Sequence, residues 1–431
     1  MKKFFFYFAF LICILIFNGC SDNPNENINN RGNLTRVYDS ILIDSIILKD
    51  GLLELDHQDP NFIDYKAVYD SIRARKTSLY LVLGQVIEYT SVDVKNREKN
   101  LSGIVFFPAS FKKIENVPVI CLTHATQIMR DLAPSSFPKY LKPSDFPEVV
   151  IGIAMAATGY VVCMPDYQGM GKDVSEFHPF CNGELLGKAS ADMIIATRKL
   201  FANNQNISLS SQNFVIGYSE GGYVALATTK EFEKEYPNYT LSGSVPMEGP
   251  YDLTGTMIGV MLADTAFPVP YFLPYMIRGY MEVYPTEFNW SNILTEPYLT
   301  TLPPLVDGYH NGDIINSAMP KSKVVKEIFN SNFITNLKDP KSSIFQKLYL
   351  NNIWFNWNPK TEIMLIHCKK DDCVPYNNTL VTYNEFRIKK GLTNVNKFEP
   401  EIYLPFGETV HVQAAPACFL AGYLWILTKT H

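Results

Sequence analysis

A serine flanked by glycines is the residue of this chain best suited to nucleophilic chemistry. Ser219 lies in Gly-Tyr-Ser-Glu-Gly-Gly (217–222), after the apolar run FVI and before the helix-forming stretch YVALATTKEF. A G-x-S-x-G segment between a strand and a helix forms a sharp turn, and the glycines are needed because a Cβ there would collide with neighbouring backbone. The turn projects the serine hydroxyl from the sheet edge. We therefore predict that Ser219 is a nucleophile.

A serine hydroxyl needs a base, and the base needs a carboxylate that orients it. Downstream of Ser219, histidines occur at positions 310, 367, 411 and 431. His411 follows the last predicted strand, whereas the others fall in a predicted helical insertion, inside a buried strand and at the final residue. His411 is therefore the predicted base, in the chain order serine, acid, histidine.

The acid is expected at the end of a strand that precedes the histidine. The strand EIMLIHC (362–368) runs into KKDDCVPY, which places Asp371 and Asp372 at its C-terminal end. Asp371 is preferred because it stands four residues before Pro375 and because two neighbouring side chains cannot both face one imidazole. Glu248, after an earlier strand, is a further candidate, since acids also occur there in folds of this kind.

Two backbone N–H groups should bind the negative charge that develops on the attacked carbonyl oxygen. One belongs to the residue after the nucleophile, here Glu220. The second is expected in the turn Leu-Thr-His-Ala-Thr-Gln (122–127), where Thr126 is the predicted donor and Ala125 the alternative. His124 is expected to hold this loop in place.

Short apolar runs separated by helical stretches must position these side chains. Such runs are typical of buried parallel strands linked by helices, and two earlier segments, 78–93 and 100–110, alternate as antiparallel strands do. The apolar runs are 117–123, 159–166, 213–219, 242–249, 362–368 and 398–406. The sequence predicts an α/β fold with a mostly parallel central sheet, its core formed by residues 37–250 and 360–431.

One interval, 251–359, breaks the alternation because it contains no clear buried strand. It is rich in aromatic residues and prolines, and 321–337 has a helical pattern. A structureless loop of this length is uncommon, so the interval predicts a helical cap that covers the active site and excludes water. Its aromatic residues, Tyr271, Phe272, Tyr275 and Tyr280 among them, suit helix packing and substrate binding equally well.

The first residues predict export and lipid anchoring. Two lysines precede the apolar run 4–17, which is too short to span a bilayer comfortably, and the chain continues into Phe-Asn-Gly-Cys (17–20). A small residue directly before a cysteine resembles the cleavage site of bacterial lipoprotein signal peptides, with an ordinary secretory signal as the alternative. Residues 1–19 are therefore predicted to be a signal peptide and Cys20 a lipid anchor, which places the protein in the cell envelope, at the outer membrane.

After the anchor, residues 20–36 are polar and rich in asparagine, and they predict a flexible tether. Removal of Lys2 and Lys3 with the signal peptide changes the formal net charge from −5 to −7. Mild acidity without a dense basic run argues against nucleic acid as a partner. No C-x-x-C pair occurs, which argues against a zinc ribbon.

Several motifs of the chain resemble those of the α/β-hydrolases and, within them, the branch related to fungal secretory lipases. The matching pieces are PDYQGMG (165–171), HPF (178–180), GYSEGG (217–222), KDDCVP (370–375) and HVQAAP (411–416). The resemblance implies hydrolysis of carboxylic esters through an acyl-enzyme, without a metal or cofactor. Tyr167 and His178, inside these motifs, are candidates for the pocket lining, although packing explains both.

Three hypotheses follow for the function. The first is an esterase that acts on lipids or acylated glycans, which an anchored envelope enzyme would meet outside the cell. The second is a serine peptidase of the same fold, ranked lower because no propeller repeat is visible. The third is a surface binding lipoprotein without catalysis, and the Ser, Asp, His set argues against it.

Overall fold

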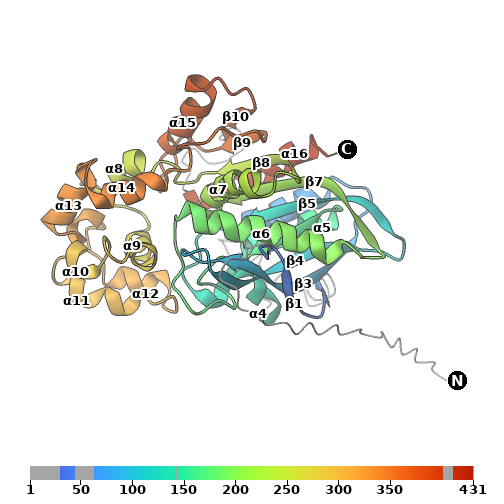
Figure 1. The fold of residues 1–431 in the computed structure, drawn as a ribbon, viewed down its shortest axis with the longest axis horizontal. Coiled ribbons are helices and arrows are strands. Elements are labelled where there is room, and N and C mark those ends of the chain that lie inside the picture. Colours follow the sequence, from blue (N-terminus) through green and yellow to red (C-terminus); the bar gives the residue numbers. More distant parts are fainter. Residues whose placement is uncertain (1–29, 44–62, 141–142, 401–410, 431) are drawn as a thin grey trace.

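The computed structural model describes residues 30–43, 63–140, 143–400 and 411–430 (Figure 1). The predicted signal peptide, the predicted anchor Cys20 and the first ten residues of the predicted tether lie outside the described residues. No helix in the described ranges has both the length and the apolar character needed to cross a membrane.

A ten-stranded sheet forms the centre of the molecule, in the order β1-β3-β4-β6-β5-β7-β8-β9-β10, with β2 paired to β3. The pairs β1–β3, β3–β4 and β4–β6 are antiparallel, and the strands from β6 to β10 along this order are parallel. The strands are β1 (Leu34–Val37), β2 (Ile41–Leu42), β3 (Leu81–Val92), β4 (Glu98–Ala109), β5 (Ile114–Thr123), β6 (Val161–Pro165), β7 (Ile207–Tyr218), β8 (Thr240–Met247), β9 (Ile363–Ile366) and β10 (Val395–Phe398). The predicted α/β fold with a mostly parallel sheet is confirmed.

Helices cover both faces of this sheet (Figure 1), which explains why its central strands are apolar on both sides. On one face, α6 (Gly183–Phe201) and α7 (Glu220–Glu235) pack over an apolar core built around β4, β5 and β7. The other face carries α3 (Ile63–Arg73), α5 (Pro147–Ala157) and α16 (His411–Leu427). Because these strands are parallel, their C-terminal ends lie on the same side of the sheet, and the connections to the helices begin there.

The interval between β8 and β9 is helical and lies to one side of the sheet (Figure 1). It has its own apolar core, which continues onto α7 and the end of β9. Its α-helices are α8 (Ile258–Met261), α9 (Phe272–Val283), α10 (Trp290–Ile293), α11 (Tyr298–Thr301), α12 (Gly312–Ser317), α13 (Ser331–Lys338) and α14 (Ser343–Leu350). We call this segment the cap. The short helices α4 (Phe137–Tyr140) and α15 (Asn377–Tyr383) lie outside it.

The predicted tether extends too far along the chain, because its last residues, 30–36, are folded. β1 begins at Leu34 and pairs with β3. Just before it, Arg31 lies 3.0 Å from both Asp192 and Glu231, which belong to α6 and α7. The local sequence does not reveal β1, because four residues are too few to show a strand period. It does not reveal the ion pairs of Arg31, because they join positions about 160 to 200 residues apart.

Two element boundaries also differ from the prediction. β10 spans Val395–Phe398 and so begins before the predicted run 398–406, of which residues 401–406 lie outside the described residues. The predicted helical stretch 321–337 is divided into a 3-10 turn (Val325–Ile328) and α13. The division occurs because the Asn330 side chain accepts the Phe333 N–H and starts a new helix, as asparagine favours at an N-cap.

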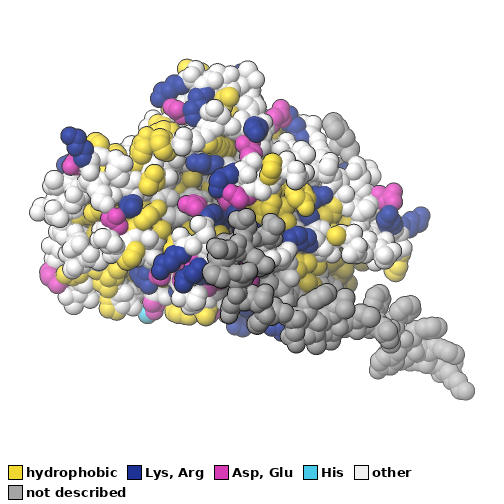
Figure 2. Space-filling model, viewed as in Figure 1, with side chains coloured by type: hydrophobic (Ala, Val, Ile, Leu, Met, Phe, Trp, Pro, Cys, Tyr) yellow, Lys and Arg dark blue, Asp and Glu magenta, His cyan; other side chains and the backbone are white. Residues whose placement is uncertain are grey.

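The visible surface has charges of both signs interspersed, with no single-sign field (Figure 2). This agrees with the mild net charge of −5. Electrostatic recognition of a polyanion requires clustered lysines and arginines. The face seen in Figure 2 offers no such cluster.

Candidate active site

Ser219 occupies the turn between β7 and α7 in a strained backbone conformation, with φ 58° and ψ −121°. Positive φ is costly for a residue with a Cβ and persists only where the surroundings hold it. The two glycines make the turn possible. A Cβ on Gly217 would lie 2.4 Å from the Gly221 oxygen, and one on Gly221 would lie 2.1 Å from the Thr123 oxygen.

Thr123, the last residue of β5, ties this turn to the neighbouring strand. Its hydroxyl lies 2.8 Å from the Gly221 carbonyl oxygen and 3.1 Å from that of Ile216. The side chain is fully buried. Sequence analysis did not single out Thr123, because the contact joins residues almost a hundred positions apart.

His411 joins the serine to an acid. Its Nε2 lies 2.8 Å from Ser219 Oγ, and its Nδ1 lies 2.7 Å from Asp371 Oδ2. All three residues are buried, with 7%, 5% and 9% of Ser219, His411 and Asp371 exposed. Because Asp371 can only accept, Nδ1 carries the proton and Nε2 is free to accept the serine proton. The structure thus brings together the three residues predicted as nucleophile, base and acid.

The two adjacent aspartates have different contacts with this histidine. Asp371 faces the ring, and its other oxygen accepts the N–H groups of Cys373 and Val374, both at 2.8 Å. Asp372 instead accepts the main-chain N–H of His411 at 2.8 Å. Asp371 therefore orients the imidazole, and Asp372 fixes the start of α16.

Charge and hydrogen bonds hold Asp371 in its ionised form. Burial alone would raise the pKa of this carboxyl, but the charge of His411 and hydrogen bonds from His367 and His411 lower the pKa well below its usual range. His367 Nε2 lies 3.3 Å from Asp371 Oδ2, and its Nδ1 lies 2.8 Å from the Thr379 hydroxyl. His367 is thus a supporting residue, and no local pattern connects it with the acid.

The remaining acid candidate, Glu248, also reaches the histidine. Its Oε2 lies 3.2 Å from His411 Nδ1, and its side chain is fully buried. Burial lowers the pKa of His411, but Asp371 and then Glu248 raise the pKa more strongly, so that it lies above its ordinary value. The sequence offered Glu248 and Asp371 as alternatives, whereas the structure places both carboxylates at the same ring nitrogen.

The predicted oxyanion-binding residues lie next to the serine. Glu220 is the first residue of α7, so its N–H has no partner within the helix. Thr126 and Glu220 line the same pocket as Ser219. The N–H of Ala125, the alternative donor, points instead to the two oxygens of Glu148, at 2.8 and 3.1 Å.

Glu148, near the start of α5, holds the loop 122–127 in place through its hydrogen bonds with the Ala125 N–H. Burial raises the pKa of its carboxyl to about 8. His124 is also buried, and burial lowers its pKa to about 4. Its ring stacks on Tyr167 at 4.0 Å, and the Tyr167 hydroxyl donates to the His124 carbonyl at 3.0 Å. His124 therefore lies where a loop-holding residue was expected.

Neither Tyr167 nor His178 is among the described residues that line the pocket around Ser219. Tyr167 is fully buried against the loop. His178 Nε2 lies 2.7 Å from Glu220 Oε1, and its Nδ1 lies 3.0 Å from the Gln168 carbonyl oxygen. Both residues thus support the predicted oxyanion-binding segments from behind.

The pocket over Ser219 is small and apolar, with a volume of about 40 Å³, which is room for only a few water molecules. Most of its lining comes from the cap. The apolar lining residues from α8, α9 and the segments around them are Leu253, Met257, Val260, Met261, Phe267, Phe272, Leu273 and Met276. An acyl chain would therefore meet hydrocarbon and thioether groups rather than hydrogen-bonding partners.

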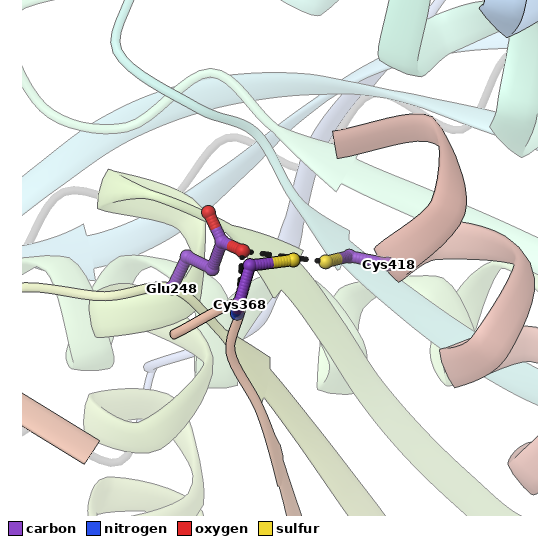
Figure 3. Close-up of side chains that lie close together, drawn as sticks. All are labelled: Glu248, Cys368 and Cys418. Carbon is purple, nitrogen blue, oxygen red and sulfur yellow. Dashed lines mark hydrogen bonds between the residues drawn. The ribbon is translucent and has the colours of Figure 1, made fainter. Parts of the chain in front are cut away.

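Two groups of side chains have residue types and spacing that could hold a metal ion. One is Glu248 with Asp371 and His411, and the other is Glu248 with Cys368 and Cys418 (Figure 3). Hydrogen bonds already engage the carboxylate oxygens of both groups. Burial raises the pKa of the Cys418 thiol, which disfavours the thiolate that a metal requires. We assign no metal to either group.

A family model for the prolyl oligopeptidase family matches residues 151–245. This stretch runs from α5 to β8, so it contains the nucleophile turn but neither His411 nor Asp371. A search of curated proteins gave no match.

Solved structures share the fold over most of the chain. A Legionella pneumophila protein has a TM-score of 0.75 at 24% identity, covering 92% of this chain and 98% of that one. The rice cell wall degrading esterase LipA from Xanthomonas oryzae has a TM-score of 0.74 at 21% identity, covering 93% and 100%. Candida antarctica lipase A has a TM-score of 0.61 at 17% identity, covering 88% and 78%. The chain therefore shares the α/β fold of these structures over most of its length.

Proposed function

We propose that the protein is a serine hydrolase that cleaves carboxylic esters through an acyl-enzyme, with Ser219, His411 and Asp371 as its triad. The proposal rests on the position of His411 between the other two residues. Its Nε2 lies 2.8 Å from the Ser219 hydroxyl, and its Nδ1 lies 2.7 Å from the Asp371 carboxylate. A nucleophile, a base and an orienting carboxylate in this arrangement form the unit that acyl transfer requires.

The reaction proceeds in two balanced halves. His411 Nε2 takes the Ser219 proton as Oγ attacks the carbonyl carbon, and the N–H groups of Glu220 and Thr126 bind the resulting oxyanion. The imidazolium then returns the proton to the leaving alkoxide, which departs as an alcohol. Water, deprotonated by the same nitrogen, attacks the acyl-serine and releases the acid and the free hydroxyl.

The lining of the pocket supports an ester with an apolar acyl group. The cap supplies methionine, leucine and phenylalanine side chains over the serine, and such surfaces gain free energy by covering hydrocarbon. Two of the structural neighbours are named as an esterase and a lipase. A lipid or an acylated glycan is therefore the proposed substrate class.

A peptidase of the same fold is the second candidate, and the match to the prolyl oligopeptidase family favours it. The matched segment, 151–245, holds the sheet strands and nucleophile turn that esterases and peptidases of this fold have in common. It includes none of the cap residues that would distinguish an amide from an ester. The ester proposal is therefore preferred.

We further propose that Cys20 anchors the enzyme by lipid to the bacterial cell envelope, at the outer membrane. The support is the sequence pattern of residues 1–20. Mass spectrometry of the membrane fraction should find a diacylglyceryl modification on Cys20. Detection of the protein as an unmodified soluble species in which residue 20 is internal would contradict the anchor.

The experiment for the catalytic proposal compares wild type with Ser219→Ala. Wild-type protein should hydrolyse p-nitrophenyl esters and react with a fluorophosphonate probe, and the variant should lose both activities, by about 10⁴-fold or more in kcat. Peptidyl p-nitroanilides serve as the amide comparison. Full turnover and labelling by the variant would disprove the triad, and faster cleavage of the anilides than of the esters would favour the peptidase.

A further inference from the structure

Glu248 lies immediately after β8, at a position that couples two parallel strands to the catalytic histidine. Its backbone has φ 46°, and its N–H donates to the carbonyl oxygen of Ile366, the last residue of β9, at 2.9 Å. The side chain is fully buried. A buried carboxylate is expensive unless it is fully hydrogen-bonded, so its partners indicate what it does.

Four donors surround this carboxylate. Oε1 accepts the Cys368 N–H at 2.9 Å and the Cys418 S–H at 3.6 Å (Figure 3). Oε2 accepts the Tyr218 hydroxyl and lies 3.2 Å from His411 Nδ1. The Asp371 carboxylate is a further close neighbour, so both carboxyl groups lie beside the same ring nitrogen.

We propose that Glu248 is a second positioning carboxylate of the active site, which shares the Nδ1–H of His411 with Asp371 and sustains part of the catalysis when Asp371 is removed. The inference rests on the proposed function, because it concerns the same base. Nδ1 lies 2.7 Å from Asp371 and 3.2 Å from Glu248, so Asp371 makes the shorter contact. Either acceptor keeps the proton on Nδ1 and leaves Nε2 free to face Ser219.

Apart from His411, the donors to the Glu248 side chain differ from those to the Asp371 side chain. Glu248 is held by Cys368 at the end of β9, Cys418 on α16 and Tyr218 at the end of β7. The Tyr218 hydroxyl also lies within hydrogen-bond distance of the main-chain oxygen of His411, so one side chain links the second carboxylate to the helix that carries the base. Loss of Asp371 therefore leaves Glu248 in place.

The second carboxylate has a measurable electrostatic consequence. The charged or titratable groups facing the imidazole are Asp371, Glu248, Asp372, Tyr218 and, through Asp371, His367. Asp371 and Glu248 are the two carboxylates at the ring itself. Each stabilises the protonated ring, so removal of one charge should lower the pKa of the base. The His411 ring is then neutral, and able to act as the base, at a lower pH than in the wild-type protein.

Glu248→Gln is the direct test, since it keeps the side-chain shape and an oxygen for Cys368. We expect the acidic limb of kcat/KM for a p-nitrophenyl ester to move about one pH unit lower. KM at the optimum should be unchanged, because Glu248 does not line the pocket. Glu231→Gln, another buried glutamate, which pairs with Arg31 away from the site, is the matched control and should keep the wild-type profile.

Removal of the first acid gives the second test. Asp371→Ala should lower kcat by about 10²-fold, and the double variant Asp371→Ala/Glu248→Gln by about 10⁴-fold, the loss typical of a triad without its acid. An unshifted pH profile in Glu248→Gln together with equal rates for the single and double Asp371 variants would overturn the proposal. If the Asp371 variants fail to fold, the pH profile of Glu248→Gln decides alone.

These outcomes are separable from a failure of the proposed function. If Ser219→Ala keeps wild-type activity, the triad itself is wrong. If Ser219→Ala is inactive while Glu248→Gln behaves as Glu231→Gln does, the triad stands and Glu248 is only a structural link between β8 and β9.

Discussion

The buried carboxyl group of Glu148, which binds the loop beside Ser219, should make the stability of the folded protein depend on pH. Its two oxygens accept the Ala125 N–H, and burial raises its pKa to about 8 from an ordinary value of 4.5. Between these two pH values the folded protein holds a proton that the unfolded chain releases. Stability is therefore expected to fall as pH rises from 4.5 through 8.

Glu148→Gln should remove this dependence, because an amide has no proton to lose and its oxygen can still accept the Ala125 N–H. At pH 5 the variant and wild type should melt together, and at pH 9 the variant should melt roughly 3 to 6 °C higher. Thermal unfolding followed by circular dichroism across this range is the measurement. Glu362→Gln, at a surface pair with Lys429, is the control. Identical slopes for Glu148→Gln and wild type would contradict the assignment.

At the residue scale, a catalytic residue could be predicted where its immediate sequence neighbours identify it. Ser219, His411 and Asp371 could be predicted because each follows a recognisable strand and because chain order limits the choices. The joint placement of Glu248 and Asp371 could not be predicted, since it depends on how β8 and β9 align side by side. The same holds for the pair His178 and Glu220, which are 42 residues apart.

At the scale of elements, α7 and β5 approach each other closely at Gly221. A Cβ on Gly221 would lie 2.1 Å from the Thr123 oxygen and 2.8 Å from the His124 oxygen, both backbone atoms that cannot rotate away. Gly221→Ala should therefore separate helix from strand. We expect a loss of about 3 kcal/mol in unfolding free energy, and a kcat about 10²-fold lower because the serine moves relative to the histidine.

Gly259→Ala is the matched control for this glycine. Gly259 lies in α8, and nothing is within 4 Å of the position of its Cβ. Alanine there should leave kcat unchanged and raise stability slightly, by about 0.5–1 kcal/mol, because glycine is a poor helix residue. Denaturant unfolding and ester kinetics test both variants. Wild-type kinetics in Gly221→Ala would show that the turn tolerates a Cβ.

The elements themselves were predictable in proportion to their length and periodicity. The long apolar and alternating runs predicted the strands from β3 to β9, and the stretch after Ser219 predicted the helix α7. β1 has four residues and β10 has four, and their places depend on long-range partners rather than local pattern. The division of 321–337 at Asn330 was readable in principle, because asparagine commonly caps a helix.

For the whole molecule, the sheet and the cap have separate tasks. The sheet brings the ends of β7, β8 and β9 to one edge, where the nucleophile and both carboxylates meet. The cap closes over that edge and leaves a volume of only about 40 Å³ beside Ser219. Substrate selection should therefore depend on the cap side chains that line this volume.

Two substitutions on α9 should change acyl-chain preference in opposite directions. Leu273 and Met276 both line the pocket. Leu273→Trp fills it, so kcat/KM for p-nitrophenyl octanoate relative to acetate should fall by about 10²-fold, and Met276→Ala enlarges it, so the same ratio should rise by about tenfold. Because the ratio compares two esters on one protein, a loss of folded material in either variant cancels. Ile314→Trp, on the exposed side of α12, should keep the wild-type ratio. Parallel changes in all three variants would mean that the acyl group binds elsewhere, and opposite changes confined to α9 would identify the cap as the element that selects the ester.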